Sequence, residues 1–117
     1  MVYLELFAGP VPVIDKDDYR TYAKKMGAIT KKAGALSVTA CWGEGVPAGM
    51  LRALAPAIGI EPGEALACRL VKWPSKAARD AGWANMMQTP DNDMANIRMP
   101  FDRARVHYAD FEVLDEA

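Results

Sequence analysis

The chain has 117 residues, 51% of them hydrophobic and 25% charged, which is the size and composition of one globular domain. Its 14 basic and 15 acidic side chains leave a net charge of -1, so no positive field favours nucleic acid. No apolar run approaches the roughly 20 residues that cross a bilayer, and the N-terminus lacks the features of a signal peptide. We therefore expect a single cytoplasmic domain over residues 1–117 that binds neither membranes nor nucleic acids.

The first half of the chain predicts a strand, a helix and a second strand. Residues 2–9 alternate aliphatic side chains and are followed by Pro10 and Pro12, which predicts a strand that ends in a turn. Apolar residues then recur at three- and four-residue spacing over residues 16–33, with Asp15 as the N-cap and Gly34 after the last turn. Residues 35–42 alternate again and predict the second strand.

The second half predicts a strand, a helix and a last strand. Residues 64–73 form the third strand, and a second helix starts at Ser75 and ends at Thr89-Pro90. A short helical turn is predicted over residues 91–97 and the last strand over 105–114. We expect the inward face of the second helix to consist of Ala77, Ala81, Ala84 and Met87. The order βαββαβ predicts an α+β protein of ferredoxin-like type with an antiparallel sheet.

Four short motifs resemble the YbaA-like family of bacterial proteins. They are PVP after the first strand, KKAGAL at the end of the first helix, WPSKAARD at the start of the second and MPFD before the last strand. The resemblance covers nearly the whole chain, and the chain departs from the family pattern at Leu6, Ala109 and Asp110. It implies a dimeric α/β barrel, in which two ferredoxin-like sheets face each other, and therefore a homodimer. It implies no established activity.

Strand alternation divides the residues of the sheet into two sets. We expect the almost purely apolar set to lie under the two helices: Leu4, Leu6, Leu36, Val38, Ala40, Leu66, Cys68, Leu70, Ala109, Phe111 and Val113. The other set mixes aromatic and charged side chains and is expected on the open face: Tyr3, Glu5, Phe7, Ser37, Thr39, Cys41, Ala67, Arg69, Val71, Trp73, Tyr108, Asp110 and Glu112. A face of this kind suits a dimer cleft or a ligand chamber.

The candidate ligand-binding residues belong to the second set and are Glu5, Arg69, Asp110, Tyr108 and Trp73. In a ferredoxin-like sheet, Glu5 has Arg69 on one side and Asp110 on the other. One interpretation is a structural ion-pair network. The other is a chamber in which Arg69 anchors a small, anionic molecule and a carboxylate transfers protons.

The sequence identifies no catalytic residue and does not decide whether the protein is an enzyme. Nucleotide-binding and hydrolase motifs are absent, the two cysteines and His107 lie far apart, and we expect neither a cofactor nor a metal. A small-molecule chamber and a non-catalytic dimeric interaction or regulatory module therefore both remain open.

The sequence also predicts the roles of the cysteines and the histidine, of the methionines, and of the long connection between the second and third strands. Strand alternation places Cys41 and Cys68 on opposite faces of the sheet, so we expect two free thiols. The same alternation places His107 at the edge of the helix-covered side. Core filling is expected of Trp83, Met86, Met87, Met94 and Met99. The apolar connection over residues 43–63 either packs on its own domain or covers a partner subunit.

Overall fold

The computed structural model describes residues 1–44, 59–88 and 97–117. Short 3-10 turns at Val13–Asp15 and Arg103–Arg105 precede α1 and β4. The predicted turn at 91–97 and most of the 43–63 connection lie outside the described residues. The main elements are β1 (Tyr3–Pro12), α1 (Lys16–Lys32), β2 (Ser37–Gly43), β3 (Glu64–Trp73), α3 (Lys76–Gln88) and β4 (His107–Glu112).

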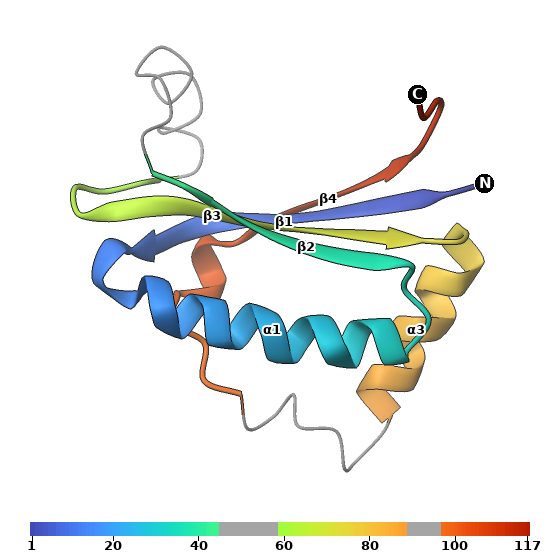
Figure 1. Ribbon diagram of the computed structural model, residues 1–117, viewed down its shortest axis with the longest axis horizontal. Helices are drawn as coiled ribbons and strands as arrows, with labels where there is room; N and C mark the ends of the chain where they lie inside the picture. The colour runs from blue at the N-terminus through green and yellow to red at the C-terminus, as the bar shows by residue number, and fades with distance from the viewer. Residues whose placement is uncertain (45–58, 89–96) are drawn as a thin grey trace.

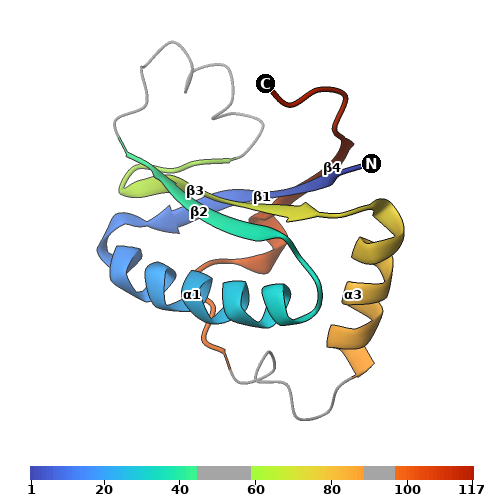
Figure 2. The same ribbon diagram turned by 45° about the vertical axis from the view of Figure 1, so that its right-hand side comes forward.

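The four described strands form one antiparallel sheet in the order β2-β3-β1-β4. Both helices cover the same face of this sheet, α1 along it and α3 at one end (Figures 1 and 2). The predicted α+β, ferredoxin-like arrangement is confirmed. The third strand spans the predicted residues, and Gly34 follows α1 with a positive φ of 119°, a conformation that glycine adopts without steric cost.

β1 is longer than predicted, because it continues through Pro10 and Pro12. Its pairing with β4 runs only from Tyr3 to Ala8, so residues 9–12 are paired with β3 alone. Proline lacks a backbone N–H and is tolerated where a strand has one unpaired edge. The prolines that suggested a turn therefore occupy the part of β1 that lacks one neighbour.

The helices cover the face of the sheet that we expected to be open. Val71 and Trp73 are fully buried and Glu5 is only 1% exposed, whereas Leu6 and Leu70 lie partly exposed on the opposite face. The assignment was therefore wrong for β1, β3 and β4. The apolar content of the two faces gave the wrong choice because charged residues such as Glu5 and Arg69 lie on the covered face, and no described element covers the more apolar face.

β2 follows the prediction, because Val38 packs beside Gly27 of α1. Since Ala40 is paired with Arg69 and Cys41 with Cys68, both cysteines lie on the open face, and the expectation of opposite faces was wrong. His107 is also exposed rather than covered. Which residues of β2 share a face with which residues of β3 depends on the register of the two strands, and the sequence does not specify that register.

Helix α3 begins as predicted but turns a different face inward. The Ser75 Oγ accepts a hydrogen bond from the backbone N–H of Ala78 at 3.0 Å. The buried positions are Gly82 and Met86, while the four residues expected to face inward are exposed. A Cβ on Gly82 would lie 2.5 Å from the ring of Trp73, so only glycine allows the helix to approach the indole this closely.

Among the described residues, the apolar core forms two clusters. The first joins Val11, Tyr19, Ala23 and Ala67, with Tyr22, Trp42 and Phe101 packed against it. The second joins Ala35, Val71, Trp73 and Met86, with Phe7 and Trp83 among its neighbours. Residues of the first cluster and neighbours of the second, Phe7 and Trp83, line a cavity between the sheet and the helices.

Candidate functional site

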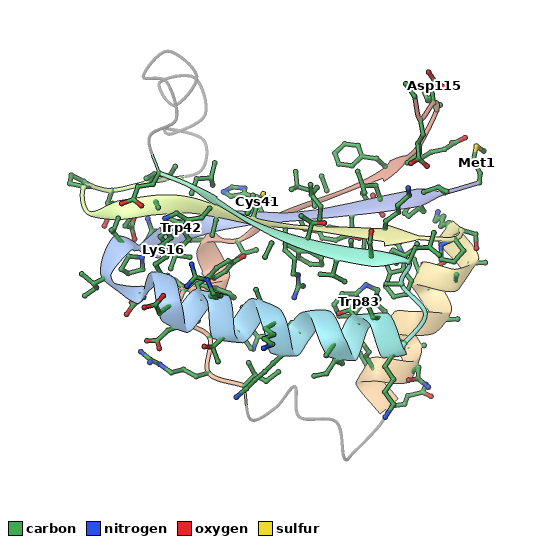
Figure 3. The ribbon with its side chains drawn as sticks, in the orientation of Figure 1. Met1, Lys16, Cys41, Trp42, Trp83 and Asp115 are labelled. Atoms are coloured by element: carbon green, nitrogen blue, oxygen red, sulfur yellow. The ribbon has the colours of Figure 1, made fainter. Side chains whose placement is uncertain are left out.

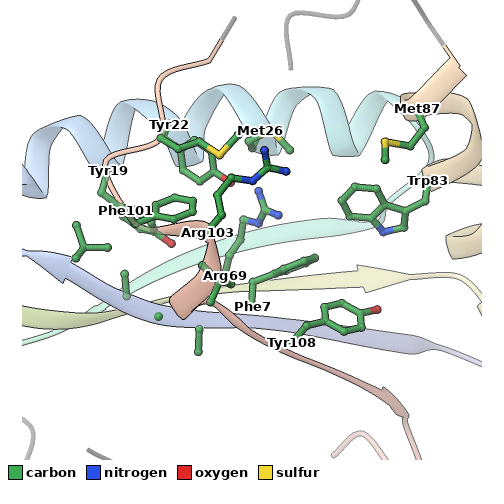
Figure 4. A pocket seen from close by; sticks show the side chains of 16 residues that line it. Phe7, Tyr19, Tyr22, Met26, Arg69, Trp83, Met87, Phe101, Arg103 and Tyr108 are labelled. Carbon is green, nitrogen blue, oxygen red and sulfur yellow. The ribbon is translucent and has the colours of Figure 1, made fainter. Parts of the chain in front are cut away.

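The cavity between the two core clusters has a volume of about 390 Å³ (Figure 4). Its floor comes from β1 and β3, and its walls come from α1, α3, the start of β4 and residues 99–106. Most of the surrounding side chains are aromatic or sulfur-containing: Phe7, Tyr19, Tyr22, Met26, Trp83, Met87, Met99, Phe101 and Tyr108. A mainly apolar cavity of this size, with few polar groups, is typical of a small-molecule site.

Arg69 is the charged side chain on the floor of the cavity. It is 4% exposed, and its Nε and one terminal nitrogen, Nη1, have no hydrogen-bond partner. Its guanidinium lies 4.6 Å from the centre of the Phe7 ring and 5.9 Å from that of Tyr22. Ring contacts attract a cation but leave its N–H groups unsatisfied, which costs free energy in a buried position. Arg69 therefore lines the cavity and has buried donors without acceptors.

Arg103 and Tyr19 add further polar atoms to the same cavity. Arg103 is exposed, and Figure 4 shows its side chain and that of Arg69 directed into the cavity. Burial raises the pKa of the Tyr19 hydroxyl to about 12, so this group stays protonated at neutral pH and keeps its donor. These groups give the apolar cavity an anion-attracting character.

Glu5 lies at the α3 end of this region and is surrounded by donors. Its carboxylate accepts hydrogen bonds from Trp73 Nε1 at 2.5 Å, from Trp83 Nε1 at 3.0 Å and from the Tyr108 hydroxyl at 2.6 Å. These residues come from β3, α3 and β4, so a single buried carboxylate joins three elements to β1. The arrangement satisfies a group that would otherwise be costly to bury.

Arg79 of α3 supplies the positive charge beside Glu5, 3.6 Å from its carboxylate. It also donates hydrogen bonds to the Tyr108 hydroxyl at 2.7 Å and to Asp110 at 2.8 Å. The hydrogen bond from Arg79, followed by one from Tyr3, lowers the pKa of the Asp110 carboxyl. This cluster fixes the position of α3 on the sheet.

The predicted candidates separate into two groups. Glu5 is opposite Asp110 in the β1–β4 register, as expected, but it is opposite Val71 on β3, and Arg69 pairs with Phe7. The expected pairing of Glu5 with Arg69 was therefore wrong. Arg69 and Tyr108 line the cavity, whereas Glu5, Trp73 and Asp110 belong to the packing and ion-pair cluster beside it.

Sequence reasoning missed Arg79 and Arg103 and treated Trp83 as core filler. Arg79 and Trp83 are four residues apart on one helix, a spacing that places both on the same face, and this signal was present in the sequence. Met86 is buried as expected, Met99 lines the cavity and Met87 is 76% exposed. Met94 lies outside the described residues.

The layers and cavity define a ferredoxin-like α+β domain with a pocket between its sheet and helices. The solved structure of Rv0793 from Mycobacterium tuberculosis shares this fold, with a TM-score of 0.50 and 14% identity, over 100% of this chain and 99% of that one. The chain belongs to the family described as "Protein of unknown function (DUF1428)", which matches residues 2–103.

Two relatives match almost the whole chain. It is 36% identical over 117 residues to "Uncharacterized protein YbaA" of Escherichia coli strain K12, covering 99% of this chain and 100% of the relative. The protein of the same name from Shigella flexneri matches with the same identity and coverage.

Two further properties of the described residues concern membranes and metals. No helix among them is long and apolar enough to cross a membrane. Within the same residues, no group of three or more histidine, cysteine, aspartate or glutamate side chains is placed to hold a metal ion.

Proposed function

We propose that the protein binds a small anionic molecule with an apolar body in the cavity between the sheet and the helices. The observation that carries this proposal is the buried guanidinium of Arg69, which has two nitrogens without acceptors and faces the cavity. An anionic group of the ligand would accept charge-assisted hydrogen bonds from these unpaired donors and offset their desolvation cost. The site is thus on the covered face of the sheet.

The walls support an aromatic or aliphatic body for this ligand. Phe7, Tyr22 and Phe101 surround the space beside the guanidinium, and Tyr22 and Phe101 contact each other edge to face with centroids 5.0 Å apart. Flat apolar groups pack favourably between such rings. The exposed Arg103 provides a second charge that would draw anions toward the opening.

The experiment is calorimetric titration with matched pairs of acids and amides. Benzoate and 2-naphthoate carry the carboxylate, and benzamide and 2-naphthamide keep the ring but lack the charge. We expect the acids to bind and the amides to bind at least about tenfold more weakly, which corresponds to the charge-assisted hydrogen bonds. Equal binding of acid and amide would contradict the assignment of Arg69 as an anion anchor.

Acetate and inorganic phosphate serve as controls for the apolar body. Both are anions and lack a ring, so they should bind more weakly than naphthoate if the walls contribute. Phosphate binding as tight as that of naphthoate would show a simple anion site at the opening and would contradict the proposed apolar part of the ligand.

A second candidate function is self-association through the open face of the sheet. Phe111 is 46% exposed there, next to partly exposed leucines on β1 and β3: Leu4, Leu6, Leu66 and Leu70. A contiguous apolar face of this kind favours association with another protein surface. A second copy of this chain is the partner we propose, because two such faces are alike in chemistry and a two-fold dimer buries both at once.

Sedimentation equilibrium tests the homodimer. We expect wild-type protein to sediment with twice the chain mass of 12.8 kDa, and Leu70→Glu, at the centre of the open face, to sediment as a monomer. Ile14→Glu is the matched control, since Ile14 is 93% exposed in the turn before α1 and away from this face. A monomeric wild type at all workable concentrations would contradict the proposal.

A further inference from the structure

Cys41 and Cys68 are direct cross-strand partners. They lie opposite each other in the antiparallel pairing of β2 and β3, and both are free thiols. Their neighbours Ala40 and Arg69 form the adjacent pair, and Arg69 points under the helices, so the two thiols share the open face. Figure 3 shows Cys41 on the side of the sheet away from α1.

The register brings the two cysteines within the backbone separation that a disulfide requires. Directly opposed residues of an antiparallel pair have Cα atoms about 4.5–5.5 Å apart. A disulfide requires Cα atoms about 4.4–6.8 Å apart, with both Cβ atoms on the same side. In agreement with this geometry, Cys41 lies close enough to Cys68 to raise the pKa of its thiol.

The two thiols differ in their surroundings. Cys41 is exposed on β2, an edge strand of the sheet, whereas Cys68 is partly buried on the central strand β3. Burial and, after it, the neighbouring Cys41 raise the pKa of the Cys68 thiol to about 11. A thiol with a raised pKa is a poor first nucleophile, and an exposed thiol meets a dissolved oxidant first.

We propose that Cys41 and Cys68 form a reversible oxidation site, which a hydroperoxide converts into an intrachain cross-strand disulfide. The Cys41 sulfur attacks the peroxide, an S–O bond forms as the O–O bond breaks, and hydrogen peroxide releases water. The Cys68 sulfur then attacks Cys41, the S–S bond forms as the S–O bond breaks, and the Cys68 proton leaves with the oxygen as a second water. Two thiols lose two electrons, and the peroxide gains them.

The test exposes reduced native protein to hydrogen peroxide, then alkylates the remaining thiols in denaturant and weighs the intact chain. We expect wild type to lose both thiols together, to become lighter by two hydrogen atoms and to regain both thiols with dithiothreitol. Cys68→Ser should stop at a sulfenic acid on Cys41 that dimedone traps. Cys41→Ser should keep its remaining thiol through the same exposure.

Three results would overturn the proposal. Wild-type protein that keeps both thiols would show that the pair does not oxidise as a unit. A bridge between two chains would show that the partner is not the cross-strand neighbour. Loss of the single thiol of Cys41→Ser as fast as the wild type loses its pair would show that Cys41 is not the residue attacked first. Since the readout is the mass of the chain, none of these results depends on the cavity or its ligand.

Discussion

Replacing Arg69 by methionine separates a ligand anchor from a structural ion pair. Methionine keeps much of the length and apolar stem of arginine but removes the charge and all donors. The two nitrogens without acceptors each cost about 1–3 kcal/mol when buried. The cation–π contacts with Phe7 and Tyr22 offset about 1–2 kcal/mol of this cost. We therefore expect the free energy of unfolding to stay the same or to rise, by up to about 5 kcal/mol.

The assay is urea denaturation in buffer without carboxylates, and Arg79→Met is the matched control. Arg79 is 12% exposed, donates hydrogen bonds to Tyr108 and Asp110 and lies beside Glu5, so the same substitution should lower the free energy of unfolding by about 2–3 kcal/mol. Arg69→Met should also lose the response to naphthoate. A loss of 3 kcal/mol or more in Arg69→Met (about the cost of breaking a buried pair) would refute the reasoning.

Three further predictions concern the packing around the site. Glu5→Gln turns an accepting oxygen into a donor among donors and should lower the free energy of unfolding by about 3–5 kcal/mol in urea denaturation, and an unchanged midpoint would contradict this role. Gly82→Ala should cost about 1–3 kcal/mol because its Cβ would lie 2.5 Å from the buried indole. Gly27→Ala, whose Cβ has ordinary contacts, should instead stabilise α1 by about 0.5–1 kcal/mol, and equal effects of the two changes would refute the packing argument. The pKa of Asp110 is lowered below its ordinary value of 3.8, so its bond with Arg79 adds stability above that pH and loses it as the pH falls through the lowered pKa. Asp110→Asn should therefore lower the melting temperature at pH 7. The melting temperature of the variant should also fall less on acidification than that of the wild type, and an equal fall in both proteins would contradict this.

The order of elements could be predicted because it depends on local signals. Ser75 caps the start of α3 and Gly34 follows the end of α1. Each of these residues acts on backbone groups within one helical turn of its own position. The faces of the sheet could not be assigned in the same way. The alternation along a strand decides which of its residues share a face. The apolar content of the two faces was used to predict which face the helices cover, and here the helices cover the more polar one.

The candidate site was predicted in part, for a related reason. Arg69 and Tyr108 were singled out as charged and aromatic residues on one strand face, and they do line the cavity. Their surroundings depend on tertiary contacts with Tyr22 of α1 and Phe101 before β4, which no spacing in the chain encodes. The partner of Glu5 was missed because Arg79 approaches from α3, and strand pairing alone considers only neighbours within the sheet.

The most direct measurement of the central claim is an NMR titration that observes the arginine side chains. Protein labelled at the arginine Nε position is titrated with 2-naphthoate, and Arg69→Met assigns the Arg69 signal by its absence. We predict that the Arg69 Nε–H resonance moves downfield and saturates with the affinity measured by calorimetry, as its unpaired donor gains an acceptor. Saturable binding of naphthoate that leaves the Arg69 resonance in place, or the absence of binding altogether, would contradict the claim that this buried guanidinium anchors an anionic ligand.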